Sequence, residues 1–140
     1  MVYSRDHPEI KHVGLFGAVH QRALAQRGGY DDVLFTAPDG TISEIATSNI
    51  GFISESGQLV WPAADMLSGI TMCLINQDRD EDVLSHTITV TDLAGYVGAV
   101  ATNAATGVRT IAAVDDTAWS EHPLVAELRA HYESIPPEKI

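Results

Sequence analysis

Cysteine and lysine are both scarce in this sequence of 140 residues. The single cysteine, Cys73, can form neither an internal disulfide nor a metal site built from several thiolates within the chain. Lysine occurs only at Lys11 and Lys139, and the formal net charge is -11. Because nucleic acids and anionic membranes are bound by clusters of lysine and arginine, we expect neither of them as a partner.

A long apolar run is absent as well, so the sequence offers no membrane-spanning segment. Its N-terminal stretch, MVYSRDHPEIKH, is too polar for a signal peptide. Together with the single thiol, these absences predict a soluble, cytoplasmic protein. The hydrophobic content of 45% is enough for one globular domain with its own core, which we expect to cover residues 1–140.

Several common catalytic fingerprints are also missing. The sequence has no phosphate-binding GxxxxGK, no GxGxxG after a strand and no GxSxG nucleophile elbow. Its six histidines lack zinc-ligand spacing and have no thiolate to join them, so we expect no metal site. We expect His12 and His20, on or near the first helix, to be surface or capping residues.

Hydrophobic periodicity and turn residues predict one α+β domain without repeats or linkers. After an extended start at 2–4, helices are expected at 13–27, 69–76 and 123–134, with a short helical turn at 92–95. Strands are expected at 32–37, 41–46, 50–54, 58–61, 87–90, 97–102 and 108–114, the first four as a meander. We expect 62–68 to be irregular, 78–82 to be a solvated loop and the tail 136–140 to be frayed. The first helix carries Leu15, Phe16, Val19, Ala23 and Leu24 near one side.

Glu44 is the one acid in the segment 40–52, GTISEIATSNIGF. The alternation over 41–45 has the period of a half-buried strand, which puts Glu44 on the same face as Ile42 and Ala46. A carboxylate on an apolar face is costly unless something cationic meets it. The alternative is that the pattern slips by one residue and that Glu44 is solvated.

The residues that remain for chemistry are Lys11, Glu44 and two segments that could offer backbone N–H groups to an anion. One segment is 69–71, at a helix start, where free amides and the helix dipole favour a phosphate. The other is the small-residue turn 103–107, NAATG. Pyridoxal phosphate requires such a set: an amine to form an imine, a carboxylate to keep the pyridine nitrogen protonated, and donors for the phosphate.

In this order the residues resemble the fold-type IV pyridoxal phosphate enzymes. These are the class IV aminotransferases, which include branched-chain and D-amino acid aminotransferases and aminodeoxychorismate lyase. The match covers nearly the whole chain in four blocks, which read KHVGLFGAVHQRALAQRGGYDDVLF, DGTISEIATSNIGF, LVWPAADMLSGIT and TNAATGVRTIAAVDD. The implied fold is a single α+β domain with a mixed or antiparallel sheet, or an open barrel, and flanking helices.

The resemblance implies roles for particular side chains. Lys11 takes the place of the lysine that forms the imine with pyridoxal phosphate, and Glu44 that of the acid that pairs with the pyridine nitrogen. The other residues implied at the cofactor are Thr47, Ser48 and Asn49 beside it, Gly69, Ile70 and Thr71 at a first phosphate cup, and Asn103 and Ala104 at a second. We expect burial and the charge of the cofactor to lower the pKa of Lys11.

The sequence also departs from the family pattern. Phe16 or Leu15 stands where many members have a tyrosine that binds the cofactor. Further differences are Ile45 for a common glycine, Gly51 for a common aromatic residue, Ser68 for a common proline, Met72 for a common arginine or lysine, and a short loop at 62–67. The largest difference is length, because family enzymes begin with another domain of comparable size. We therefore expect this chain to be the cofactor-bearing C-terminal half.

The resemblance implies amino group transfer between an amino acid and a keto acid through an imine on Lys11. One alternative is the elimination chemistry of aminodeoxychorismate lyase. Another is a non-catalytic half-protein that acts by association, in which Lys11 is merely the start of a helix; an exposed apolar face would support it. By resemblance we expect a homodimer, or association with a missing N-terminal domain.

Overall fold

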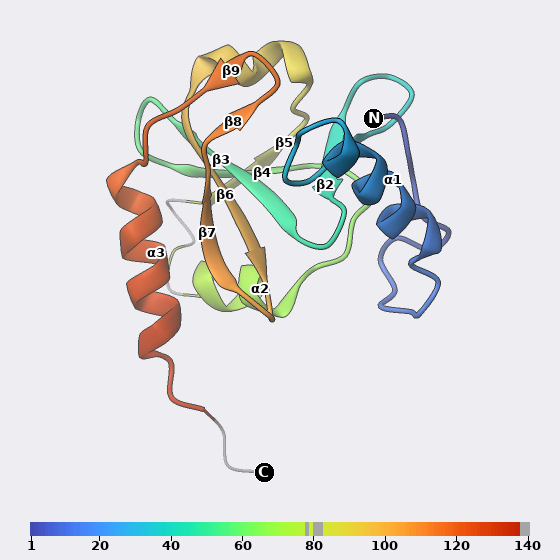
Figure 1. The fold of residues 1–140 in the computed structure, drawn as a ribbon. Coiled ribbons are helices and arrows are strands. Elements are labelled where there is room, and N and C mark those ends of the chain that lie inside the picture. Colours follow the sequence, from blue (N-terminus) through green and yellow to red (C-terminus); the bar gives the residue numbers. More distant parts are fainter. Residues whose placement is uncertain (78, 80–82, 138–140) are drawn as a thin grey trace.

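The computed structural model describes residues 1–77, 79 and 83–137 (Figure 1). Along the chain the elements are α1 (Phe16–Arg27), β1 (Leu34–Thr36), β2 (Ile42–Ile45), β3 (Asn49–Ser54), β4 (Leu59–Pro62), α2 (Ile70–Asn76), β5 (Val83–His86), the 3-10 helix η1 (Val90–Gly95), β6 (Tyr96–Asn103), β7 (Gly107–Ile111), β8 (Ala113–Val114), β9 (Thr117–Ala118) and α3 (Pro123–Ser134). The expected loop at 78–82 and the expected frayed tail lie outside the described residues, except for residues 79, 136 and 137.

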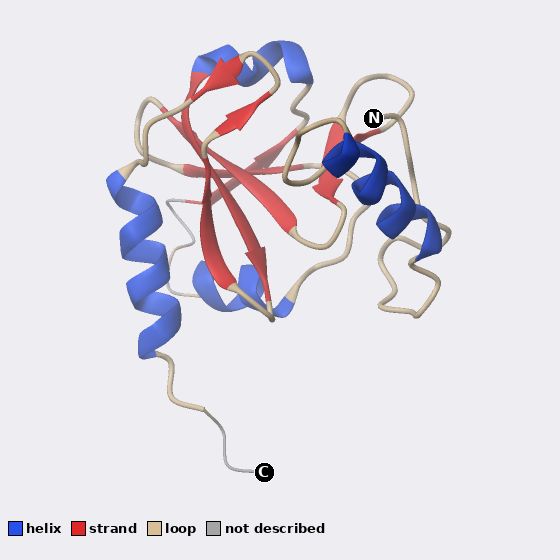
Figure 2. Ribbon diagram, in the orientation of Figure 1, coloured by secondary structure: helices blue, strands red, loops and turns tan. Residues whose placement is uncertain are grey.

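A five-stranded mixed sheet with the order β5-β4-β3-β6-β7 forms the centre of the domain (Figures 1 and 2). Strand β3 pairs antiparallel with β4 and with β6, β6 pairs antiparallel with β7, and β4 pairs parallel with β5. The other described strands form two smaller sheets of two strands each, β1-β2 and β8-β9. The predicted α+β domain with a mixed sheet and flanking helices is therefore confirmed.

The central strand β3 is buried on both faces, which divides the core in two. Ile50 and Phe52 point into one cluster, which also contains Ile42 from β2 and Leu93 from η1. Ile53, on the other face, joins a second cluster with side chains from β4, α2 and α3. Since alternate residues of a strand point to opposite faces, this one strand connects both halves of the core.

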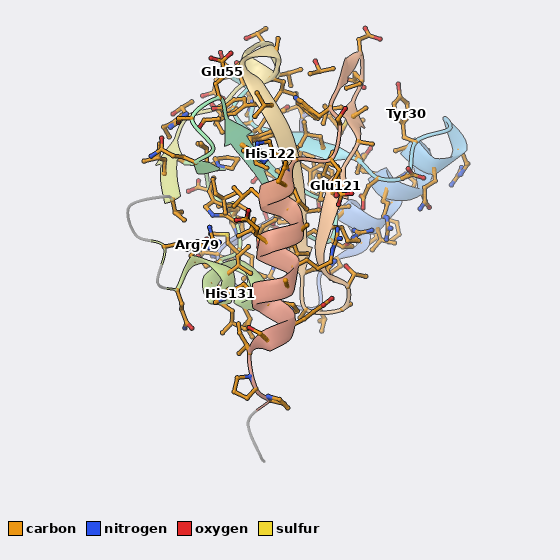
Figure 3. All side chains as sticks on the ribbon, turned by 90° about the vertical axis from the view of Figure 1, so that its left-hand side faces the viewer. Tyr30, Glu55, Arg79, Glu121, His122 and His131 are labelled. Atoms are coloured by element: carbon orange, nitrogen blue, oxygen red, sulfur yellow. The ribbon has the colours of Figure 1, made fainter. Side chains whose placement is uncertain are left out.

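Helix α3 covers the second face of the sheet, and its predicted bounds, 123–134, are confirmed. It begins at Pro123, a residue suited to the first helical position. The ring nitrogen Nδ1 of His122 accepts a hydrogen bond from the N–H of Leu124 at 3.2 Å, which caps the helix start. Figure 3 shows α3 from the front, with His122 at its start and His131 towards its other end.

The predicted strand at 87–90 is wrong. The edge strand is β5, and its side chains are mostly exposed, so it lacks the alternation that would have identified it. It is a strand because its backbone pairs with β4, with Val60 opposite Leu84. The apolar signal at 87–90 comes from Ile88, which is fully buried and whose carbonyl accepts a hydrogen bond from the N–H of Ile42 at 2.7 Å.

Two further strand predictions differ from the structure. The strand expected at 108–114 is interrupted at Ala112, and its last part, β8, turns back through Asp115, at φ 47°, to pair with β9. The expected meander is interrupted between β2 and β3. A tight turn there, with hydrogen bonds of 3.1 and 3.2 Å between Ile45 and Ser48, carries the chain from the small sheet into the large one.

Helix α1 lies apart from α2 and α3, beside the β1-β2 sheet (Figures 1 and 2). Its buried residue is Ala18, which packs with Phe35 and Ala46. The larger apolar side chains that the sequence places along one side of this helix are exposed instead, Phe16 to 82% and Val19 to 52%. Among the described helices, α1 included, none has the length and hydrophobicity needed to cross a membrane.

Candidate functional site

Glu44 lies on β2 with only 14% of its side chain exposed, so the solvated alternative is wrong. Its Oε1 lies 3.3 Å from Nε of Arg5, whose side chain is 7% exposed. The backbone N–H of Leu67 also donates a hydrogen bond to the carboxylate. Burial raises the pKa of Glu44, and the charge of Arg5 offsets this only in part. The cation required by a carboxylate on an apolar face is therefore Arg5, which the sequence did not single out.

Lys11 lies in the loop between Arg5 and α1, and its side chain is exposed. The predicted burial of this lysine is therefore wrong for the chain described here. The physical reason is that its neighbours in the loop project outward, with Val13 completely exposed and Phe16 exposed to 82%. His12 in the same loop accepts a hydrogen bond from the N–H of Gly14 at 3.0 Å, but α1 has no side-chain cap at its N-cap residue Leu15.

A pocket of about 380 Å³ brings Lys11 together with Thr47, Asn103 and Ala104. Its lining also includes two arginines that the sequence reading missed, Arg22 of α1 and Arg109 of β7. Arg22 is held by an ion pair with Asp32, 3.4 Å from Nε to Oδ2. Three cationic side chains thus converge on one pocket in a chain with a net charge of -11. The arginines have no recognisable spacing to Lys11, because a helix and a strand that are far apart in sequence bring them to the pocket.

Asn103 shapes the wall of this pocket through both ends of its amide. Its Oδ1 accepts hydrogen bonds from the N–H groups of Ala105 and Thr106, at 2.9 and 2.8 Å, and from the Thr106 hydroxyl at 2.9 Å. Its Nδ2 donates to the hydroxyl of Ser48 at 2.7 Å, which joins the turn to the end of β2. The N–H groups of Ala105 and Thr106, which were predicted as donors to an anion, therefore already donate to Asn103.

Asn49 connects the turn region to the start of α2. Its Nδ2 donates to the carbonyl of Leu67 at 2.6 Å and lies 3.7 Å from the sulfur of Met66. A side chain at Gly69 would overlap Oδ1 of Asn49, so glycine is required there for close packing. Leu67 therefore contacts both Asn49 and Glu44, which places the first predicted phosphate cup beside the acid.

The two other residues of that cup face different ways. Ile70 is 70% exposed, whereas Thr71 is 1% exposed. The hydroxyl of Thr71 has no hydrogen-bond partner within the described part of the chain. The first intrahelical hydrogen bond runs from the N–H of Cys73 to the carbonyl of Gly69 at 2.9 Å, so the preceding N–H groups at 70–72 lie ahead of the helical ladder.

The predicted site residues thus fall into two connected groups. Lys11, Thr47, Asn103 and Ala104 line the pocket, with Ser48 bound to Asn103. Glu44, Asn49, Gly69, Ile70 and Thr71 lie outside its lining, around the loop that leads into α2. Within residues 1–77, 79 and 83–137, no group of three or more histidine, cysteine, aspartate or glutamate side chains could hold a metal ion.

Comparisons with known proteins bear on the family and the fold of this chain. The family model for amino-transferase class IV matches residues 1–114. A probable branched-chain-amino-acid aminotransferase from Rickettsia felis is 28% identical over an alignment of 126 residues, and the match covers 84% of this chain and 43% of the relative. The chain thus spans less than half the length of that curated relative.

Solved structures share the fold. A putative 4-amino-4-deoxychorismate lyase from Legionella pneumophila superposes with a TM-score of 0.82 at 22% identity, over 91% of this chain and 51% of the other. The PLP form of a branched-chain amino acid aminotransferase from Thermobaculum terrenum also gives 0.82 at 22% identity, over 91% of this chain and 44% of the other. At these identities the likeness establishes the fold.

Proposed function

Because this chain belongs to the class IV aminotransferase family, we propose that it forms the pyridoxal phosphate site of an enzyme that transfers amino groups between an amino acid and a keto acid. The observation that carries the proposal is the pocket where Lys11, Arg22 and Arg109 converge. Keto acids are small anions and amino acids carry a carboxylate group, which such a pocket would attract. We place the reaction in the cytoplasm, in keeping with the single thiol.

The residues present fit the anionic end of the cofactor. A phosphate monoester carries two negative charges, and the two arginines of the pocket, Arg22 and Arg109, supply opposite charge. The unpartnered hydroxyl of Thr71 and the N–H groups at 70–72 supply further donors beside the same region. A buried hydroxyl without a partner is unusual, and a bound acceptor would satisfy it.

The residues fit the ring of the cofactor through Glu44. This carboxylate lies 3.3 Å from Arg5 and accepts the N–H of Leu67. A carboxylate has about four lone-pair sites, so it retains capacity to accept another hydrogen bond, such as one from a protonated ring nitrogen. Thr47, Ser48 and Asn49 lie next to Glu44 in sequence, and Thr47 reaches the pocket itself.

When bound, pyridoxal phosphate supplies an aldehyde carbon to which amines attach and a ring that accepts electrons from the substrate. Lys11 would hold the aldehyde carbon through its Nζ amine, and the same amine could take and return the proton of the substrate α-carbon. Glu44 would favour a protonated ring nitrogen through its negative charge. Arg22 and Arg109 orient anionic groups in the pocket.

Reductive trapping tests this proposal. The purified chain is mixed with pyridoxal phosphate, treated with borohydride and mapped by peptide mass. We expect a pyridoxyl group on Lys11 that Lys11→Ala cannot acquire, whereas Lys139→Ala serves as the matched control and still labels at Lys11. Equal labelling of both lysines, or none, would refute the proposal. Supplying aminodeoxychorismate without a keto acid then separates elimination from amino group transfer.

Association is a second candidate function, favoured by the exposed face of α1. Val13, Phe16 and Val19 are 100%, 82% and 52% exposed, and apolar surface of this kind marks sites of protein contact. The partner would be a second copy of the chain, giving a homodimer, or a second domain. The curated relative is more than twice as long as the part that matches this chain, so it is long enough to contain another domain. Sedimentation of Phe16→Ser should then show a smaller species than the wild type, whereas Val97→Ser, an exposed site on β6, should not change the mass. Identical monomers in all cases would exclude the homodimer.

A further inference from the structure

Arg5 is the most buried cation of the predicted site region, and no part of the sequence reading assigned it a role. Its side chain is 7% exposed, although the residue lies only five positions from the N-terminus. Arginine is almost never buried unless its guanidinium is paired. Here Nε forms an ion pair with Oε1 of Glu44 at 3.3 Å, without hydrogen-bond geometry, and Nη2 donates to the carbonyl of Pro8 at 2.7 Å.

The backbone before Arg5 is fixed to the small sheet. The N–H of Thr36 donates to the carbonyl of Met1 at 2.9 Å, and the N–H of Tyr3 donates to the carbonyl of Thr36 at 3.1 Å. The ring of Tyr3 packs on Phe35, with centroids 4.6 Å apart. Arg5 therefore projects from an anchored strand-like segment, so that its guanidinium has a defined position.

The two arms of the guanidinium reach two parts of the predicted site. One arm meets Glu44, and the other holds Pro8, which lies three residues before Lys11 in the same loop. The loop is further closed by a contact of 2.9 Å between Nε2 of His12 and the carbonyl of Asp6. Only an arginine has donors spread widely enough in one rigid group to do both.

Arg5 is also the charged group that acts on Glu44 among the described residues. The other polar partner is the N–H of Leu67, from the loop before α2. Burial favours the protonated, neutral form of the carboxyl group, and Arg5 opposes this effect. Without the arginine this offset would be lost and the pKa of Glu44 would rise further, which would weaken its stabilisation of a positive ring nitrogen.

We propose that Arg5 is a positioning residue of the cofactor site: its single guanidinium keeps the Glu44 carboxylate charged and fixes, through Pro8, the loop that carries Lys11. This inference rests on the proposed function, since it assumes that pyridoxal phosphate binds between these residues. It adds a residue that acts through Glu44 and Lys11 and needs no contact with the cofactor.

Two measurements on the full chain test the proposal separately from the proposed function. The first, without cofactor, follows the carboxyl carbon of Glu44 by NMR against pH. Arg5→Gln should raise the titration midpoint of Glu44 above that of the wild type, and the exposed Arg27→Gln serves as control and should not move it. An unchanged midpoint in Arg5→Gln would overturn the proposal.

The second measurement is the affinity for pyridoxal phosphate, followed by absorbance. Arg5→Gln should bind about tenfold more weakly than the wild type, as is typical when the partner of a ligating residue is removed. Arg5→Lys should keep the midpoint of Glu44 but still bind more weakly, because an ammonium group cannot reach Glu44 and Pro8 together. If Arg5→Gln does not fold, the affinity of Arg5→Lys for pyridoxal phosphate tests the proposal in its place.

The outcomes are distinguishable. Wild-type affinity in both Arg5 variants, with weakened binding in Glu44→Gln, would refute the role of Arg5 and leave the proposed function standing. A wild-type chain that takes up no pyridoxal phosphate would refute the proposed function, and the positioning role would fall with it.

Discussion

Replacing Gly69 by alanine should destabilise the fold at the junction between the two groups of site residues. The added methyl group would overlap Oδ1 of Asn49 and lie 3.5 Å from its Cγ. Asn49 is 4% exposed and cannot swing into solvent, because its Nδ2 donates to the carbonyl of Leu67 at 2.6 Å. The backbone of Gly69 has φ -68°, so the cost comes from the overlap and involves no backbone strain.

The magnitude follows from two effects. Overpacking a buried site costs about 1–3 kcal/mol. Displacing the Asn49 amide leaves the carbonyl of Leu67, or the amide itself, without its partner, which costs about 1–3 kcal/mol. The two effects share one movement and do not add fully, so we expect Gly69→Ala to lower the free energy of unfolding by about 2–4 kcal/mol.

Urea denaturation followed by tryptophan fluorescence measures this loss, with Trp61 as the buried reporter. The matched control is Gly95→Ala, where an added Cβ has nothing within 4 Å and should change the free energy of unfolding by less than about 0.5 kcal/mol. A Gly69→Ala protein as stable as Gly95→Ala would refute the reasoning, since it would mean that the Asn49 side chain can move away from the added methyl group without lowering the free energy of unfolding.

Two further predictions concern the same region. Asn103→Ala removes the acceptor for the N–H groups of Ala105 and Thr106 and the donor to Ser48. It should therefore lower the free energy of unfolding, measured by denaturation, by about 1–2 kcal/mol and reduce pyridoxyl labelling of Lys11. Asn103→Asp keeps the acceptor and should lose less stability, and equal losses in the two variants would contradict the role of Asn103. Because folding raises the pKa of Glu44 above its ordinary value of 4.5, its contribution to stability is complete below that value and falls as the pH rises through the raised pKa. Denaturation of the wild type and Glu44→Gln across this range should show the wild type losing its relative stability with rising pH, and a constant difference would count against a raised pKa.

Local patterns were sufficient for the elements that are stabilised by their own sequence. Pro123 and the apolar spacing after it define α3 from Pro123 to Ser134, because helix capping and periodicity are set by residues a few positions apart. The partial burial of Glu44 was likewise predicted, and its side chain is 14% exposed, but β2 is buried at Ile42 and Ile45 and does not show the predicted alternation. Strand β5 could not be found in this way, since its parallel pairing with β4 depends on a chain segment more than twenty residues away.

The residue types of the candidate site were readable from the sequence: one of only two lysines, a lone acid on a strand, and small residues at two turns. Tertiary structure decided which cations accompany them. Arg5 meets Glu44, and Arg22 and Arg109 join Lys11 in one pocket, because the small sheet, α1 and β7 converge there. It also decided that the apolar side chains of α1 face outward and that Asn103 binds two of the amides in its own turn. Burial, charge pairing and exposure are properties of surfaces assembled from distant segments, and a linear pattern specifies only the side chains that are available to form them.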